Sequence, residues 1–78
     1  MRDELRRLIS VILEGIVLDE GFARELAEIA HQCQQDGNPS VARGMQALSR
    51  MHRVKGIEGR AKLAGLCAQY AHILDESA

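Results

Sequence analysis

The 78-residue sequence is poor in aromatic residues, with one phenylalanine, one tyrosine and no tryptophan. Its hydrophobic core must therefore consist of aliphatic side chains. Only one proline occurs, which favours long uninterrupted elements, and the β-branched residues are too scattered to predict a sheet. These features exclude a collagen, a disulfide-rich toxin and a multidomain enzyme, and they favour a single all-α domain over residues 1–78.

Cysteines and long apolar runs are also scarce. The two cysteines, Cys33 and Cys67, belong to no CxxC motif, so we expect two small buried thiols in a reducing compartment. The longest continuous apolar run has three residues, as in Val11 to Leu13, whereas a membrane-spanning helix needs about 20. We therefore expect a cytoplasmic protein with no signal peptide and no membrane partner.

The net charge of −1 selects no strongly charged partner, although the charges are unevenly distributed. Residues 1–40 carry four basic and eight acidic side chains, whereas residues 41–78 carry six basic and three acidic ones. All six basic residues of the second half lie between Arg43 and Lys62. We interpret segment 43–62 as a helical region that neutralises the acidic segment 19–36. Nucleic-acid binding is disfavoured because no aromatic side chain is interleaved for base stacking.

Apolar side chains recur at helical spacing in the first half of the chain. A segment from Asp3 to Leu18 is apolar around most of its circumference, so it needs more than one neighbouring helix. A second helix is predicted over 21–36, with Asp19 as its N-cap and Gly37 as its C′ residue. The narrow stripe of this second helix contains Phe22, Leu26, Ile29, Ala30 and Cys33.

A third helix is predicted to begin with Asn38 as N-cap and Pro39 at the first helical position. Its apolar stripe stays in phase from residue 40 to 74 across Gly56 and Gly59. One unbroken or kinked helix of about 35 residues, near 50 Å long, is therefore favoured over two helices hinged at these glycines. The predicted fold is a small antiparallel bundle of three helices.

A chain of this length buries only about 60% of the surface that it exposes when unfolded. The first predicted helix has more apolar circumference than the rest of the chain can cover. We therefore expect a homodimer or a higher oligomer to complete the bundle. The predicted interface residues are Leu5, Leu8, Ile9, Ile12, Ile16, Val41, Met45, Leu48 and His52.

Two of the three histidines lie in patterns that bear on chemistry. His52 lies on an apolar face, where we expect a hydrogen-bonded core or interface residue whose protonation near pH 6 would weaken self-association. Glu28 and His31 form a Glu-x-x-His pair of the kind that binds metal in ferritin-like bundles. Both face away from the stripe of their helix, so a metal site could form only across a dimer interface.

The sequence contains no nucleophile paired with a base, no glycine-rich phosphate loop and no Cys/His cluster with metal-ligand spacing. We therefore expect neither an enzyme nor a cofactor. The favoured hypothesis is a small accessory or regulatory subunit that self-associates and docks on a larger protein through its first helix. The alternatives are a ferritin-like metal-binding bundle that uses Glu28 and His31, and nucleic-acid binding through segment 43–62.

Overall fold

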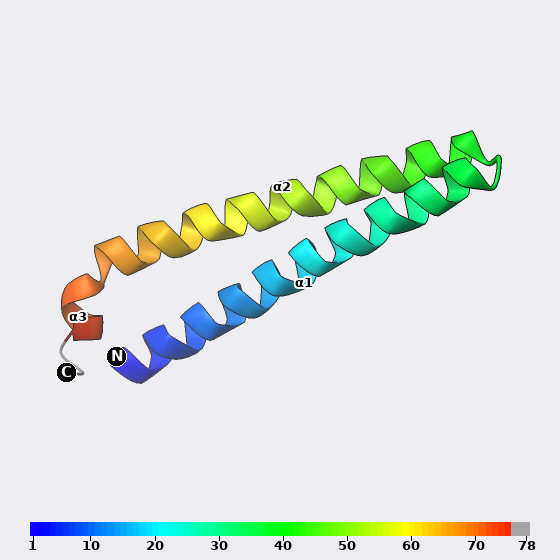
Figure 1. Cartoon of the computed structure of the whole chain (residues 1–78). Helices are drawn as coiled ribbons and strands as arrows, with labels where there is room; N and C mark the ends of the chain where they lie inside the picture. Colours follow the sequence, from blue (N-terminus) through cyan, green and yellow to red (C-terminus); the bar gives the residue numbers. More distant parts are fainter. Residues whose placement is uncertain (76–78) are drawn as a thin grey trace.

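The computed structural model, which describes residues 1–75, consists of two long antiparallel helices in a rod of 57 × 15 × 15 Å (Figure 1). Helix α1 spans Arg2–Gln35, α2 spans Pro39–Gln69 and the short α3 spans Ala71–Asp75. Residues 1–75 contain no strand, which confirms the predicted all-α class. No helix in this part of the chain combines the length and the apolar character that crossing a bilayer requires.

The predicted break between the first two helices is wrong, because α1 continues through Asp19, Glu20 and Gly21. Asp19 does not cap a helix. Instead the two acidic side chains reach across to α2, where Asp19 meets His52 and Glu20 meets Arg60. These contacts tie the middle of α1 to α2 at the point where the sequence suggested a break. The chain is therefore a two-helix hairpin with a five-residue third helix, rather than the predicted bundle of three helices.

The turn between α1 and α2 follows the prediction from the sequence. Gly37 has a φ of +81°, the left-handed conformation expected at C′. The Asn38 N–H donates to the Cys33 carbonyl at 2.8 Å and the Gly37 N–H donates to the Gln34 carbonyl at 3.3 Å, which is the Schellman pattern. Asn38 is then the N-cap of α2 and Pro39 its first residue.

Helix α2 is continuous through both glycines, as the phase of its stripe predicted, but it ends at Gln69 rather than at residue 74. A methyl group added to Gly59 would lie 2.8 Å from Cγ1 of Ile16, so the absence of a side chain permits the observed approach of α1. Gly56 is similar, since its added methyl would lie 3.3 Å from Cγ of Glu20. The two glycines are therefore packing positions rather than a hinge.

The contact between α1 and α2 follows a heptad repeat, in which contacting residues alternate at spacings of three and four. We call the residues of these two series the seam, and each of them is buried or partly buried. The α1 side of the seam comprises Leu5, Ile9, Ile12, Ile16, Asp19, Ala23, Leu26, Ala30 and Cys33. The α2 side comprises Ala42, Met45, Ser49, His52, Gly56, Gly59, Leu63, Leu66 and Tyr70.

Small residues occupy most of the buried positions of the seam. The Ser49 hydroxyl donates to the backbone carbonyl of Ala23 at 2.7 Å, which requires the two helix backbones to lie close together. Within residues 1–75, Leu5 and Ile16 are the only large apolar side chains that are buried. The hairpin therefore has a thin core.

The two cysteines lie towards opposite ends of the rod. Cys33 precedes the turn, whereas Cys67 belongs to the last turn of α2. Both thiols are free and partly buried. The antiparallel arrangement thus keeps them apart within one chain.

Candidate interaction surface

A polar pair interrupts the seam near its middle. His52 Nδ1 lies 2.8 Å from Asp19 Oδ1, and the two side chains are only 21% and 25% exposed. The Phe22 ring packs beside the imidazole, with the ring centroids 5.3 Å apart. The sequence analysis found no acid for His52 because Asp19 lies 33 residues earlier, on the other helix. His52 is thus the hydrogen-bonded residue that the sequence predicted, with its partner on the other helix of the same chain, and the effect of acid on self-association stays a prediction.

A second polar pair lies beside the seam. Arg60 donates from Nε to Glu20 Oε2 at 2.6 Å and from Nη2 to Oε1 at 2.9 Å, a two-pronged contact. These hydrogen bonds hold the pKa of the Glu20 carboxyl below its ordinary value, and the carboxylate raises the pKa of the Arg60 guanidinium. The pair links the acidic part of α1 to the basic part of α2, as the charge pattern suggested. Solvent screens it, because the Arg60 side chain is mostly exposed.

A further apolar series lies outside the seam, and we call it the apolar flank. Its α1 members repeat at spacings of three and four, with Gly15 and Glu25 filling the gaps in the series. All eight large side chains are between 41% and 59% exposed. The apolar flank comprises Leu8, Val11, Leu18, Phe22 and Ile29 from α1 and Val41, Leu48 and Met51 from α2.

The antiparallel geometry places both parts of the apolar flank on one side of the hairpin. Phe22 directly precedes Ala23, Leu48 directly precedes Ser49, and Ala23 and Ser49 face one another. When two antiparallel helices face one another at a residue of each, the residue directly before each of these two lies on the same side of the helix pair. The ring contact of Phe22 with a seam histidine of α2 agrees with this placement. The flank is therefore shared by both helices, and its series continues through four charged residues, which are Glu25 of α1 and Lys55, Glu58 and Lys62 of α2.

The structure divides the predicted interface residues between two locations. Leu8, Val41 and Leu48 belong to the exposed apolar flank. The others lie in the seam, against the second helix of the same chain, and they are Leu5, Ile9, Ile12, Ile16, Met45 and His52. Sequence analysis missed the flank as a separate surface. Each flank residue directly precedes a seam residue, so on a helical wheel the two sets merge into one broad apolar face.

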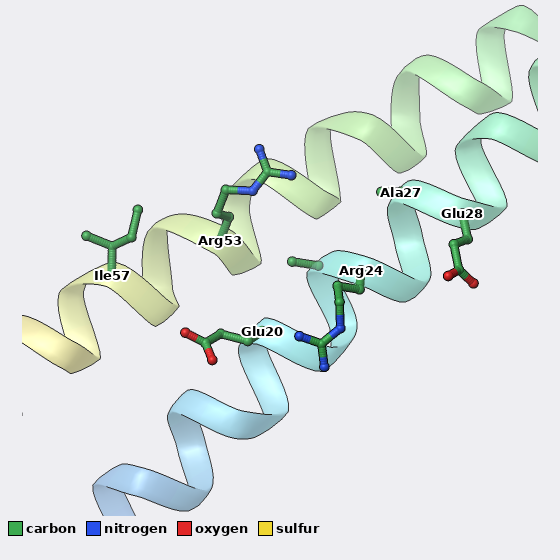
Figure 2. Close-up of a pocket in the computed structure, with 7 residues that line it drawn as sticks. Glu20, Arg24, Ala27, Glu28, Arg53 and Ile57 are labelled. Carbon is green, nitrogen blue, oxygen red and sulfur yellow. The ribbon is translucent and has the colours of Figure 1, made fainter.

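The opposite side of the hairpin carries arginines, and we call it the arginine flank. It comprises Arg24 from α1 and Arg43, Arg50, Arg53 and Arg60 from α2. Arg24 and Ala27 of α1 and Arg53 and Ile57 of α2 line a groove of about 620 Å³ (Figure 2). Among these five arginines in the described chain, only Arg60 forms an ion pair. The two flanks therefore lie on opposite sides of the hairpin, and Glu20 lies among the arginines of the second one.

The alternative metal ligands lie outside the seam. Glu28 and His31 are both exposed on α1, and Glu28 borders the groove. Across residues 1–75 no group of three or more His, Cys, Asp or Glu side chains is arranged to hold a metal ion. A ferritin-like site that combines Glu28 and His31 from two chains stays a prediction.

Comparison with known proteins identifies no relative, because no family model, curated protein or solved structure matches the chain. The functional interpretation therefore depends on the geometry of the two flanks.

Proposed function

We propose that the protein is a helical interaction module that self-associates through its apolar flank. The observation that carries this proposal is the contrast between the thin core and the flank. Only two large apolar side chains are buried in the seam, whereas eight are about half exposed on one side. At about 180 Å² for a large side chain, these eight present roughly 700 Å², close to the about 800 Å² that each partner contributes to a standard interface.

The mass of the protein in solution tests this proposal. We expect light scattering to give twice the 8.6 kDa mass of the chain. Leu48→Glu places a charge on the apolar flank and is expected to give monomers, because an unpaired charge is costly to bury. Ile57→Glu is the matched control, since Ile57 is exposed on the same helix but borders the groove on the arginine flank. A monomeric wild-type protein at micromolar concentration would refute the proposal.

The same proposal gives the dimer an accessory role on a larger protein. Leu13 and Val17 are exposed on α1 and are not part of the apolar flank, so self-association through that flank leaves them uncovered. A larger partner that covers these two side chains would use the first helix, as the sequence suggested. Val17→Glu should then abolish capture of the partner while the protein stays dimeric. Capture of the same partner by both proteins would contradict this docking role.

Nucleic-acid binding is a second candidate, and the arginine flank favours it. Arg24, Arg43, Arg50 and Arg53 lie on one side of the rod without an ion pair, although the net charge of the chain is −1. Contact of four guanidinium groups with phosphates predicts a slope of about −3 to −4 for log K against log salt concentration. Fluorescence anisotropy with duplex and single-stranded oligonucleotides measures this slope. Absence of binding at low salt would exclude the candidate.

A further inference from the structure

We infer that two copies pack their apolar flanks together around a two-fold axis that crosses α1 near Leu18, with Phe22 of each copy entering a notch at Gly15 of the other. This arrangement depends on the proposed self-association and specifies its geometry. The two α1 helices then run antiparallel, and so do the two α2 helices. The occupant of the apolar flank is therefore a second copy of the chain.

The glycines of the apolar flank provide an independent argument. A methyl group added at Gly15, Gly44 or Gly65 would meet nothing within 4 Å, unlike at Gly56 or Gly59. Glycine is a poor residue inside a helix, and packing within one chain does not require these three. Gly15 and Gly44 lie three and four residues from members of the apolar flank, and Gly65 lies 14 residues, or two heptads, after Met51. A second helix lying against this flank would use them as notches.

The positions of large and small residues match in the antiparallel arrangement. With the axis at Leu18, residues of the two α1 helices face one another when their numbers add to about 36 or 37. Phe22 of one copy then faces Gly15 of the other, and Leu8 faces Ile29. Phe22 then meets a position without a side chain, and Leu8 meets an apolar side chain of its own size, so no two aromatic rings compete for one layer.

The glycines of α2 complete the outer layers. Within one chain, a residue of α1 faces a residue of α2 when their two residue numbers add to about 72, as those of Ala23 and Ser49 do. Gly65 is therefore level with Leu8, and Gly44 is level with Ile29. Each outer layer of the dimer then holds two large side chains from the α1 helices and two glycines from the α2 helices.

A two-fold axis along the rod would pair large and small side chains of the two copies less well. It would place Phe22 and Met51 of both copies in one layer, and Gly15 and Glu58 of both copies in another. One layer would then be overfilled, whereas the other would combine an unfilled space with two carboxylates of like charge. With the two-fold axis at Leu18, each layer instead combines Phe22 and Met51 of one copy with Gly15 and Glu58 of the other, so neither layer is overfilled or empty.

The charges on this side of the hairpin also favour the antiparallel axis. Lys62 is level with Val11 of its own chain, and Val11 faces Glu25 of the second copy, so opposite charges occupy one layer. Measured along the direction of the helices, Lys55 is offset by about 7 Å from Glu58 of the second copy, which these long side chains can span. A two-fold axis along the rod would instead place Lys62 of one copy against Val11 of the other.

A disulfide crosslinking experiment tests the position of the axis. In a chain whose two cysteines are replaced by alanine, Leu18→Cys should crosslink to a covalent dimer on mild oxidation, because this residue meets itself. Leu8→Cys alone and Ile29→Cys alone should not crosslink, whereas the protein with both substitutions should. The solution mass of each reduced protein is measured in parallel.

A pair of glycine substitutions tests the notch without relying on a crosslink. Gly15→Leu should raise the dimer dissociation constant about tenfold or more, because it fills the space for Phe22 of the second copy. Gly21→Leu is the matched control on the same helix, since a side chain there also has open space and Gly21 is not in the series of the apolar flank. Both variants should fold as hairpins, because neither position is crowded within one chain.

The outcomes separate this inference from the proposed function. A dimer that crosslinks through residue 18 and weakens with Gly15→Leu supports both. A dimer that does not crosslink through residue 18, or that tolerates Gly15→Leu as well as Gly21→Leu, overturns the antiparallel arrangement and leaves self-association in place. A monomeric wild-type protein overturns both.

Discussion

Replacing Gly59 with alanine tests whether the seam is set by close approach of the two backbones. The new methyl group would lie 2.8 Å from Cγ1 of Ile16, well inside ordinary contact distance. Ile16 is 4% exposed and β-branched, so its side chain has little freedom to move away. Overpacking of this kind costs about 1–3 kcal/mol, and the better helix propensity of alanine returns about 1 kcal/mol. We therefore expect a net destabilisation of up to about 2 kcal/mol.

The control for this substitution is Gly21→Ala, where an added methyl group meets nothing within 4 Å. Gly21→Ala should stabilise the protein by up to about 1 kcal/mol, so the two variants should differ by about 1–3 kcal/mol in the free energy of unfolding. For a domain of this size, each kcal/mol shifts Tm by about 4–8 °C. Urea unfolding followed by circular dichroism, with all proteins at one concentration, measures the difference. Equal stability of Gly59→Ala and Gly21→Ala would refute the close approach.

Three further predictions concern individual contacts. A double-mutant cycle of Asp19→Ala and His52→Ala at pH 7 should give a coupling energy of about 1–2 kcal/mol, whereas a value near zero would show that the pair does not form. Because the pKa of Glu20 is depressed in the folded protein, this carboxylate binds a proton in the unfolded chain before it does so in the folded one as the pH falls. Stabilisation by the pair with Arg60 should therefore be complete above the ordinary value of 4.5 and be lost as the pH falls through the folded value. Glu20→Gln should flatten the loss of stability as the pH falls below 4.5, as measured by urea unfolding at each pH, and an unchanged profile would contradict this assignment. Gly37→Ala should cost about 1–2 kcal/mol, because the residue has a φ of +81°, and a neutral effect in the urea assay would argue against the left-handed turn.

Local features of the structure could be predicted from the sequence because short-range interactions produce them. The turn at Gly37 and the start of α2 at Pro39 depend on the backbone preferences of these residues. The continuity of α2 through Gly56 and Gly59 was predictable because the apolar stripe keeps its phase across both glycines. These features need no knowledge of what lies on the other helix.

Other features depend on contacts between residues far apart in the chain. Asp19 and Glu20 look like a helix boundary, yet they lie inside α1 because their partners are 33 and 40 residues away. The polar environment of His52 was hidden for the same reason. A single sequence without these pairings offered no means of predicting that one long helix replaces two short ones.

By itself, the sequence determined that the chain is helical and that it turns at Gly37, and it indicated more apolar surface than one chain can bury. Only the tertiary structure decided which apolar residues form the seam and which form the apolar flank. The two series differ by a single residue step, and that choice depends on how α1 is rotated against α2. The rotation depends on small residues at contact positions, because the Ser49 bond to the Ala23 carbonyl and the approach of Ile16 to Gly59 exist only when the two backbones lie close together.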